Sequence, residues 1–427
     1  MDSADLTLEH LGYKQEFQRS FGLLDMVGFS FSIVTCWTAL SGVFIIGVTA
    51  GGPPVIIFGW VGVCVVTLSV AISMAEMCSC WPVAGGQYSW VALLAPPKVS
   101  RQLSYITGWF MLTGILAIGS VNNSVSANFI FGQANLVFPE FVIQRWHTVL
   151  VTYAVATWAL LINAMIMSVG MGAVTGFIFL LTLCFCIGDI DSTAGSSTGV
   201  PVIQIFYDST RSKIGTCFMA SMMTVIVLFC SVSLLAEGSR SVFAFACDNG
   251  LPFSTVLSKV ISKRHIPLNA IIAAIFVQVA FNSIYFGTVT GFNTIISIAT
   301  TGFYISYALP LFARLLGYAS GNRTSTFRGS FSLRLPLSLS LNAVGLLSLL
   351  FAFVTFNFPS QAPVDDENMN YTSAAIGVIG LVGIVTWFIT AHRRFTGPLD
   401  GVHVVTPSSE SNVDGVCGEL DPAKVRG

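Results

Sequence analysis

Residues 53–75 read PPVIIFGWVGVCVVTLSVAISMA, a stretch without a single Asp, Glu, Lys or Arg. An α-helix rises about 1.5 Å per residue, so an uninterrupted apolar run of this length crosses the roughly 30 Å of hydrocarbon in a bilayer. The same pattern recurs along the chain, and the sequence predicts ten spans in all: residues 23–49, 53–75, 103–131, 147–164, 165–187, 215–237, 267–286, 289–313, 337–358 and 373–391.

The composition agrees with a protein that the lipid bilayer surrounds. Of the 427 residues, 54% are hydrophobic and only 9% are charged, whereas soluble domains carry about 25% charged residues. The formal net charge of −1 gives no reason to expect nucleic acid as a partner. We therefore predict an all-α polytopic membrane protein.

The positions of the basic residues predict the orientation. If the N-terminus is cytoplasmic and the ten spans alternate, only three of the 19 Lys and Arg residues fall outside, namely Arg145, Arg211 and Lys213. The other 16 lie in inner segments, as the positive-inside rule requires. The outer segment before the last span holds the sequon Asn370-Tyr371-Thr372, so Asn370 is a glycosylation candidate. Both termini are then cytoplasmic, in the plasma membrane or the vacuolar membrane.

Catalytic and metal-binding constellations are not evident. All five His residues lie at span ends or in tails, so no predicted span pairs a His with a carboxylate, as an intramembrane hydrolase or metalloenzyme would need. The pairs Cys78/Cys80 and Cys184/Cys186 have no nearby His or carboxylate partner. We expect neither an enzyme nor a metal site, and no cofactor other than a coupling ion, H⁺ or Na⁺.

Two predicted spans carry polar stretches. Residues 28–42, GFSFSIVTCWTALSG, surround Trp37 with small and hydroxyl side chains. Such a stretch either unwinds and exposes helix ends for a ligand, or simply lets helices pack closely. The span at 103–131 contains Ser120, Asn122, Asn123, Ser124, Ser126 and Asn128. That face looks toward a wet cavity or makes hydrogen bonds to other helices.

One region is inconsistent with ordinary span lengths. Residues 147–187 form a run of 41 residues without any Asp, Glu, Lys or Arg. Two spans of about 20 residues would use up the whole run and leave no residues for a connecting loop.

Two loop motifs carry a resemblance to a known family. They are AEMCSCWPVAGGQY at 75–88 and SRSVFAFACDNGLPFS at 239–254, the latter followed by IPLN at 266–269. Together with Phe21-Gly22, residues 32–42 and AGGP at 50–53, they resemble the amino acid–polyamine–organocation superfamily, and most closely its fungal amino acid/choline permeases. Cys247 departs from the motif, which usually has Arg at that position.

The resemblance implies an inverted-repeat, LeuT-like transporter fold of twelve spans, in which two discontinuous helices enclose the substrate. It implies that Thr35, Cys36, Trp37, Thr38 and Ser41 line the substrate site, and we add Asn122 and Asn123 from the polar face. Because residues 165–187 already resemble the seventh family span, the resemblance implies that the fifth and sixth spans are missing at the charge-free run.

These inferences divide the chain into three parts. They are a cytoplasmic tail at 1–22, a transporter domain at 23–391 with family spans 1–4 at 23–164 and spans 7–12 at 165–391, and a disordered cytoplasmic tail at 392–427. The expected function is secondary active transport of amino acids or related amines such as choline or GABA, by alternating access. The alternative is a truncated, non-transporting relative, or a faulty gene model of such a permease, in which Asn122 and Asn123 have lost their inward partners.

Overall fold

A computed structural model describes residues 51–165, 200–260, 267–287, 289–322, 331–358, 369 and 371–395. Within these ranges every regular element is helical, which confirms the all-α prediction. The elements are α4 (Pro53–Cys80), α5 (Gln87–Leu94), α6 (Pro97–Val137), α7 (Arg145–Met165), α10 (Pro201–Thr210), α11 (Lys213–Cys247), α12 (Ser254–Leu257), α13 (Leu268–Ser283) with its extension η1 (Ile284–Phe286), α14 (Val289–Ala319), α15 (Leu335–Thr355), and α16 (Thr372–Thr386), which continues as the π-helical η3 (Trp387–Ala391) and as α17 (His392–Arg394).

Eight of the ten predicted spans coincide with helices of the described chain. Seven helices there are long and apolar enough to cross a membrane, and these lie at Pro53–Cys80, Pro97–Val137, Lys213–Cys247, Leu268–Phe286, Thr294–Ala319, Leu335–Thr355 and Thr372–Arg394. The eighth predicted span that coincides with a helix is 147–164, which corresponds to the 21 residues of α7. The predicted span at 23–49 lies outside the described residues, as does the span at 165–187 beyond Met165.

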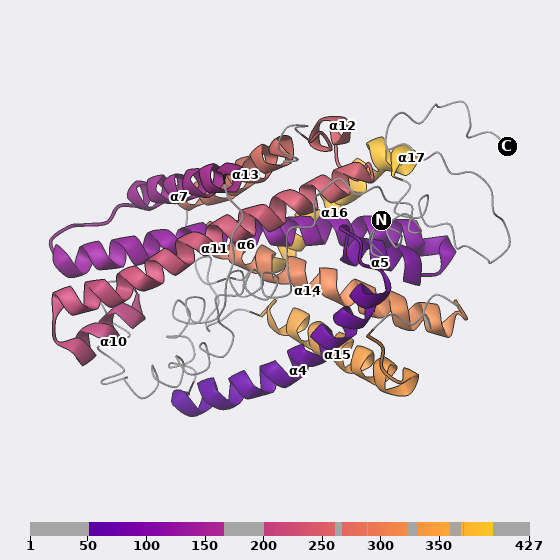
Figure 1. The fold of residues 1–427 in the computed structure, drawn as a ribbon, viewed down its shortest axis with the longest axis horizontal. Helices are drawn as coiled ribbons and strands as arrows, with labels where there is room; N and C mark the ends of the chain where they lie inside the picture. The colour runs from indigo at the N-terminus through magenta and orange to yellow at the C-terminus, as the bar shows by residue number, and fades with distance from the viewer. Residues whose placement is uncertain are drawn as a thin grey trace.

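The helices form an elongated bundle around α6 (Figure 1). Helices α11 and α14 pack along α6 in the middle of the bundle. Helices α7 and α13 lie side by side on one flank, and α4 crosses α15 on the other. Because α6 has neighbours on several sides, it is the most deeply buried of the seven candidate spans.

Glycines bring α6 and α14 into backbone contact. A Cβ atom added to Gly302 would lie 2.8 Å from the Cα atom of Gly114, and one added to Gly114 would lie 3.0 Å from the backbone N of Phe303. Neither glycine therefore has room for a side chain. In a membrane, where lipid is as apolar as leucine, this kind of close approach is a main source of helix association.

A buried carboxylate joins three segments at one end of the bundle. Glu76 of α4 is 4% exposed, and its Oε2 atom accepts from Arg314 Nη1 of α14 at 2.8 Å. Ser338 of α15 donates its hydroxyl to the same oxygen, and the backbone N–H of Leu333 donates to Oε1 at 3.2 Å. Arg314 thus neutralises the charge of Glu76, and two further donors hold its carboxylate in place.

A second polar contact joins the two loop motifs. Tyr88 of α5 donates its hydroxyl to Oδ2 of Asp248, the residue that follows α11, at 2.7 Å. Burial raises the pKa of Asp248 from 3.8 to about 6, although the Tyr88 hydroxyl works in the opposite direction because it stabilises the carboxylate. The pKa of Asp248 is thus higher in the folded protein than in the unfolded chain, so between about pH 4 and about pH 6 the folded protein binds the proton more tightly. The stability that this contributes is therefore lost as the pH rises from about 4 to about 6.

We predict that Arg314→Met destabilises the protein by about 3–5 kcal/mol, because it leaves the Glu76 carboxylate buried without a cation. The double variant with Glu76→Gln should regain most of that loss, since no charge then remains to be neutralised. Thermal unfolding of the detergent-solubilised protein measures both effects. The exposed Arg334 is the matched control, and Arg334→Met should change stability by less than about 0.5 kcal/mol. Equal stability of the Arg314→Met and Arg334→Met variants would contradict the proposed role of the ion pair.

We predict that the effect of Tyr88→Phe depends on pH. At pH 8 Asp248 is ionised, so removing the hydroxyl should cost about 1–2 kcal/mol. At pH 5 the carboxyl is mostly protonated, and the cost should be smaller because the lost hydrogen bond joins two neutral groups. Unfolding temperatures of wild type and variant at the two pH values test this, with Tyr318→Phe on an exposed tyrosine as the control. A loss of the same size at both pH values would argue against a hydrogen bond to an ionising Asp248.

Candidate functional site

The middle of α6 carries the polar side chains from which a site inside the membrane can be built. Ser120, Asn123 and Ser126 are at most 1% exposed there. Hydrocarbon offers no hydrogen-bonding partner, so such groups must find partners on other helices. The structure places two such partner helices against this part of α6, namely α11 and α13.

One set of contacts joins α6 to α13. Asn123 donates its Nδ2–H to Gln278 Oε1 at 3.3 Å, and the Ser124 hydroxyl donates to Asn282 Oδ1 at 3.1 Å. The Ser120 hydroxyl also lies 3.3 Å from the backbone carbonyl oxygen of Gln278. These five residues, Ser120, Asn123, Ser124, Gln278 and Asn282, form a buried interhelical cluster that we call the polar seam.

A second set joins α6 to α11. Asn122 donates from Nδ2 to the hydroxyl of Ser231 at 2.7 Å and to the carbonyl oxygen of Val227 at 3.1 Å. Three turns further along α6, Gln133 donates to the hydroxyl of Thr224 at 2.6 Å and accepts from the hydroxyl of Ser221 at 2.8 Å. Asn122 and Asn123 therefore point toward different helices.

The polar seam keeps unused hydrogen-bonding capacity. Gln278 and Asn282 are 2% and 1% exposed, and within the described chain their side-chain N–H groups, Nε2 and Nδ2, have no acceptor. The Gln278 amide packs against Gly119, where an added Cβ would lie 2.3 Å from Nε2. A buried donor without an acceptor costs about 1–3 kcal/mol, so the seam is a place where a polar group would be bound favourably.

The structure places some of the predicted site residues and leaves the others outside its range. Thr35, Cys36, Trp37, Thr38 and Ser41 lie outside the described residues, as does the glycosylation candidate Asn370. Asn122 and Asn123 are described, and both make interhelical hydrogen bonds. The expectation that they have lost their inward partners is wrong, because α11 supplies acceptors to Asn122 and α13 supplies one to Asn123. Asn128, by contrast, is exposed.

Sequence reasoning missed two features of the bundle. Glu76 lies at the end of the apolar run 53–75, where a carboxylate needs no partner if it faces water, yet it is buried against Arg314. The signal was available, since a carboxylate and an Arg that both lie within apolar helices are expected to pair. Gln278 and Asn282 are polar amides one turn apart in a largely apolar span, and this spacing could have identified α13 as the partner of α6.

The described residues contain no group of three or more His, Cys, Asp or Glu side chains that could hold a metal ion. Neither Cys78 nor Cys80 forms a disulfide within this part of the chain.

Comparison with known proteins identifies relatives along most of the chain. The sequence model of the amino acid permease family matches residues 21–171 and 161–384, in two pieces that overlap at 161–171. A protein of Macrophomina phaseolina that carries the name of an amino acid/polyamine transporter is 47% identical, with 82% of this chain and 97% of that protein aligned. The alignment runs over 441 positions, of which this chain fills about 350 (82% of 427), so about 90 positions of the relative face gaps.

More distant relatives have names of the same kind. An amino-acid permease of Arabidopsis thaliana is 25% identical over 94% of this chain and 97% of its own length. A choline transporter of Saccharomyces cerevisiae is 24% identical over 88% of this chain and 82% of its own length. These relatives are transporters and not enzymes, and the helices described above are those of an integral, multi-pass membrane protein. The chain belongs to the amino acid permease family, within the amino acid–polyamine–organocation superfamily.

Proposed function

We propose that this fold serves secondary active transport of amino acids or of related amines such as choline or GABA, by alternating access. The observation that carries the proposal is the match to the permease family across residues 21–384, with relatives named for amino acids, polyamines and choline. The buried polar contacts of α6 support it, because polar groups at membrane depth are costly and commonly belong to a solute pathway.

The proposed substrate site combines the hydroxyl-rich stretch Thr35–Ser41 with the polar face of α6. In inverted-repeat carriers the site lies near the bilayer midplane beside a broken helix. Trp37 would face the cationic head of an amine, an interaction worth roughly 0.5–2 kcal/mol. Asn122 and Asn123 would hold α6 in place beside the site, since their amides already bond to α11 and α13.

The coupling ion in this proposal is H⁺ or Na⁺. The described spans contain two carboxylates, Glu76 and Glu237. Glu76 is neutralised by Arg314, so it is a poor carrier of an ion. Glu237 of α11 interacts electrostatically with Arg240 on the same helix and lies close to the neutral phenol of Tyr307 of α14, which makes it the carboxylate to examine for coupling.

A second proposal concerns the 427-residue form itself, which we infer to lack the fifth and sixth family spans at the junction of Ala164 and Met165. Three observations support this. The family match breaks into two pieces at 161–171, about 90 positions of the 47% identical relative face gaps, and residues 147–187 have no charged loop. Two spans need about 40 membrane residues plus loops, which those positions can supply. The sixth span would provide the second broken helix, so a form without it does not transport.

The topology generates one prediction. We expect both termini in the cytoplasm, of a plasma-membrane or vacuolar protein, with the segment around α12 inside and the one before α16 outside. In a cysteine-free background, Val256→Cys and Met369→Cys make a matched pair, because the native side chains are 48% and 50% exposed. In sealed microsomes, whose cytoplasmic face is outward, an impermeant thiol reagent should label only Val256→Cys, and it should label both variants after permeabilisation. Labelling of Met369→Cys alone in sealed microsomes would invert the topology.

The inferred gap generates another prediction. The 427-residue form, expressed in a host without its own uptake systems, should be retained in the endoplasmic reticulum and should show no saturable uptake of labelled choline, GABA or amino acids. Inserting the two spans of a close relative between Ala164 and Met165 should restore surface delivery and saturable uptake. The control is an insertion of the same length made from a soluble linker, which should restore neither. Saturable uptake by the 427-residue form alone would refute the inferred loss of function.

A further inference from the structure

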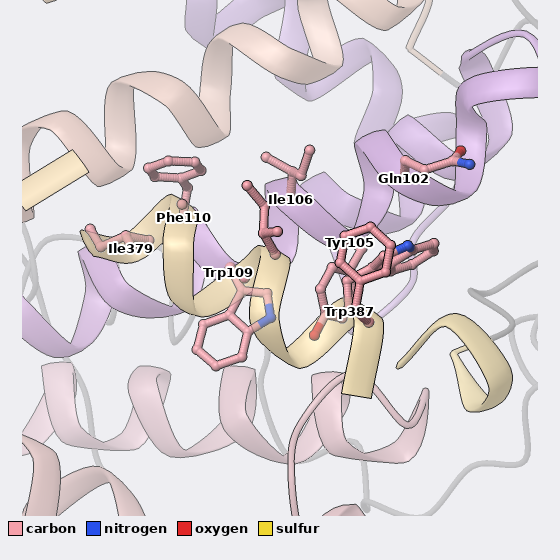
Figure 2. Close-up of a pocket in the computed structure, with 11 residues that line it drawn as sticks. Gln102, Tyr105, Ile106, Trp109, Phe110, Ile379 and Trp387 are labelled. Carbon is pink, nitrogen blue, oxygen red and sulfur yellow. The ribbon is translucent and has the colours of Figure 1, made fainter. Parts of the chain in front are cut away.

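A groove of about 370 Å³ runs between α6 and the last helix (Figure 2). Such a volume is at the lower end of the range for ligand pockets, about 300–1,000 Å³. From α6 and from α16 with η3 the groove is lined by Gln102, Tyr105, Ile106, Trp109, Phe110, Ile379, Gly380, Gly383, Ile384, Trp387 and Phe388.

The groove opens on a face that the bilayer covers. Both of its walls belong to candidate membrane spans. Ile106, Ile384 and Phe388 on its rim are 42%, 56% and 69% exposed, so the rim faces outward from the bundle. An apolar hollow at this place is filled by hydrocarbon rather than by water, because water gains no hydrogen bonds there.

The wall of the groove is apolar. The indole Nε1–H of Trp109 is buried inside the protein, so it is not presented to the groove. The neighbouring Tyr105 hydroxyl is already used, because it donates to Thr386 Oγ1 at 2.9 Å. Tyr105, Trp109 and Trp387, which contact one another through their rings (Figure 2), therefore present aromatic carbon rather than polar groups to the groove.

The mouth of the groove is cationic. Lys98 precedes Gln102 by four residues and so lies on the groove face of α6, one turn beyond it. On the other wall η3 leads directly into α17, where Arg393 and Arg394 are exposed. Neither α6 nor residues 371–395 contain an Asp or a Glu.

Arg101 holds the two sides of the mouth together. Its guanidinium donates to the carbonyl oxygens of Ala391, His392 and Phe395, and it lies 5.3 Å from the ring centre of Trp387. Three carbonyl acceptors and one aromatic face fix the end of the last helix against α6. The groove is therefore preformed, which lowers the entropic cost of filling it.

We propose that this groove binds one anionic glycerophospholipid of the cytoplasmic leaflet. An acyl chain lies along Trp109, Phe110 and Gly380, and the phosphate with its headgroup lies between Lys98 and the two arginines of α17. The occupant is a phospholipid rather than a sterol because cations at the mouth complement a phosphate, and each adds about 1 kcal/mol of attraction near an anionic surface.

Two glycines of α16 allow a controlled test. Gly380 lines the groove and has no atom within 4 Å of an added Cβ, so Gly380→Leu fills the groove without a clash. Gly377 has the same open surroundings on the same helix but does not line the groove, and Gly377→Leu is the matched control.

Native mass spectrometry of the purified full chain, titrated with phosphatidylserine or phosphatidylcholine in detergent, reads out the bound lipid. Wild type and Gly377→Leu should each retain one phosphatidylserine, with an apparent Kd at least tenfold lower than for phosphatidylcholine. Gly380→Leu should lose that molecule. In a variant with both Arg393→Gln and Arg394→Gln the groove remains, so binding should persist while the preference for phosphatidylserine falls to less than threefold.

Several outcomes would overturn the proposal. One is retention of phosphatidylserine by Gly380→Leu with the affinity of wild type. Others are equal binding of the two phospholipids to wild type, and displacement of phosphatidylserine by an equimolar sterol, which has no phosphate. If Gly380→Leu fails to fold, the arginine variant still decides, since an unchanged preference for phosphatidylserine in that variant would contradict the assigned headgroup contacts.

Discussion

Hydrocarbon accepts no hydrogen bonds, and this constraint accounts for the arrangement of the bundle. A polar group that folds into the membrane must be satisfied by another part of the same chain. Glu76 meets this condition through Arg314, Ser338 and the Leu333 amide, which come from two other helices and the segment before one of them. The relative positions of α4, α14 and α15 follow from one carboxylate, because moving any of them would expose a charge to lipid.

The same constraint explains why α6 is the organising helix. Its glycines let α14 approach to backbone contact, and its amides and hydroxyls require α11 and α13 as neighbours. Van der Waals contact and hydrogen bonding thus act on different faces of one helix.

The sequence predicted the helices well and their contacts poorly, for a physical reason. Apolar runs are local, so the spans at 53–75 and 337–358 were recognisable without any knowledge of neighbours. The helix ends were underestimated: α6 has 41 residues where 103–131 was expected, because backbone hydrogen bonding continues beyond the hydrocarbon. Asn123 and Gln278 are 155 positions apart, and no local pattern couples them. Orientation, the residues 35–41 and the junction at 164–165 remain predictions.

The separation of Glu76 and Arg314 along the chain has a consequence for biogenesis. The two residues are 238 positions apart. A ribosome adds about 5–20 residues per second, so α4 enters the membrane roughly 10–50 s before its cation is synthesised. During that interval Glu76 must stay at the aqueous surface or be shielded by the insertion machinery. The helices at this end of the bundle can therefore pack together only after α4 has been inserted. Any delay in translation between α4 and α14 lengthens the time in which quality control can recognise an unpaired carboxylate.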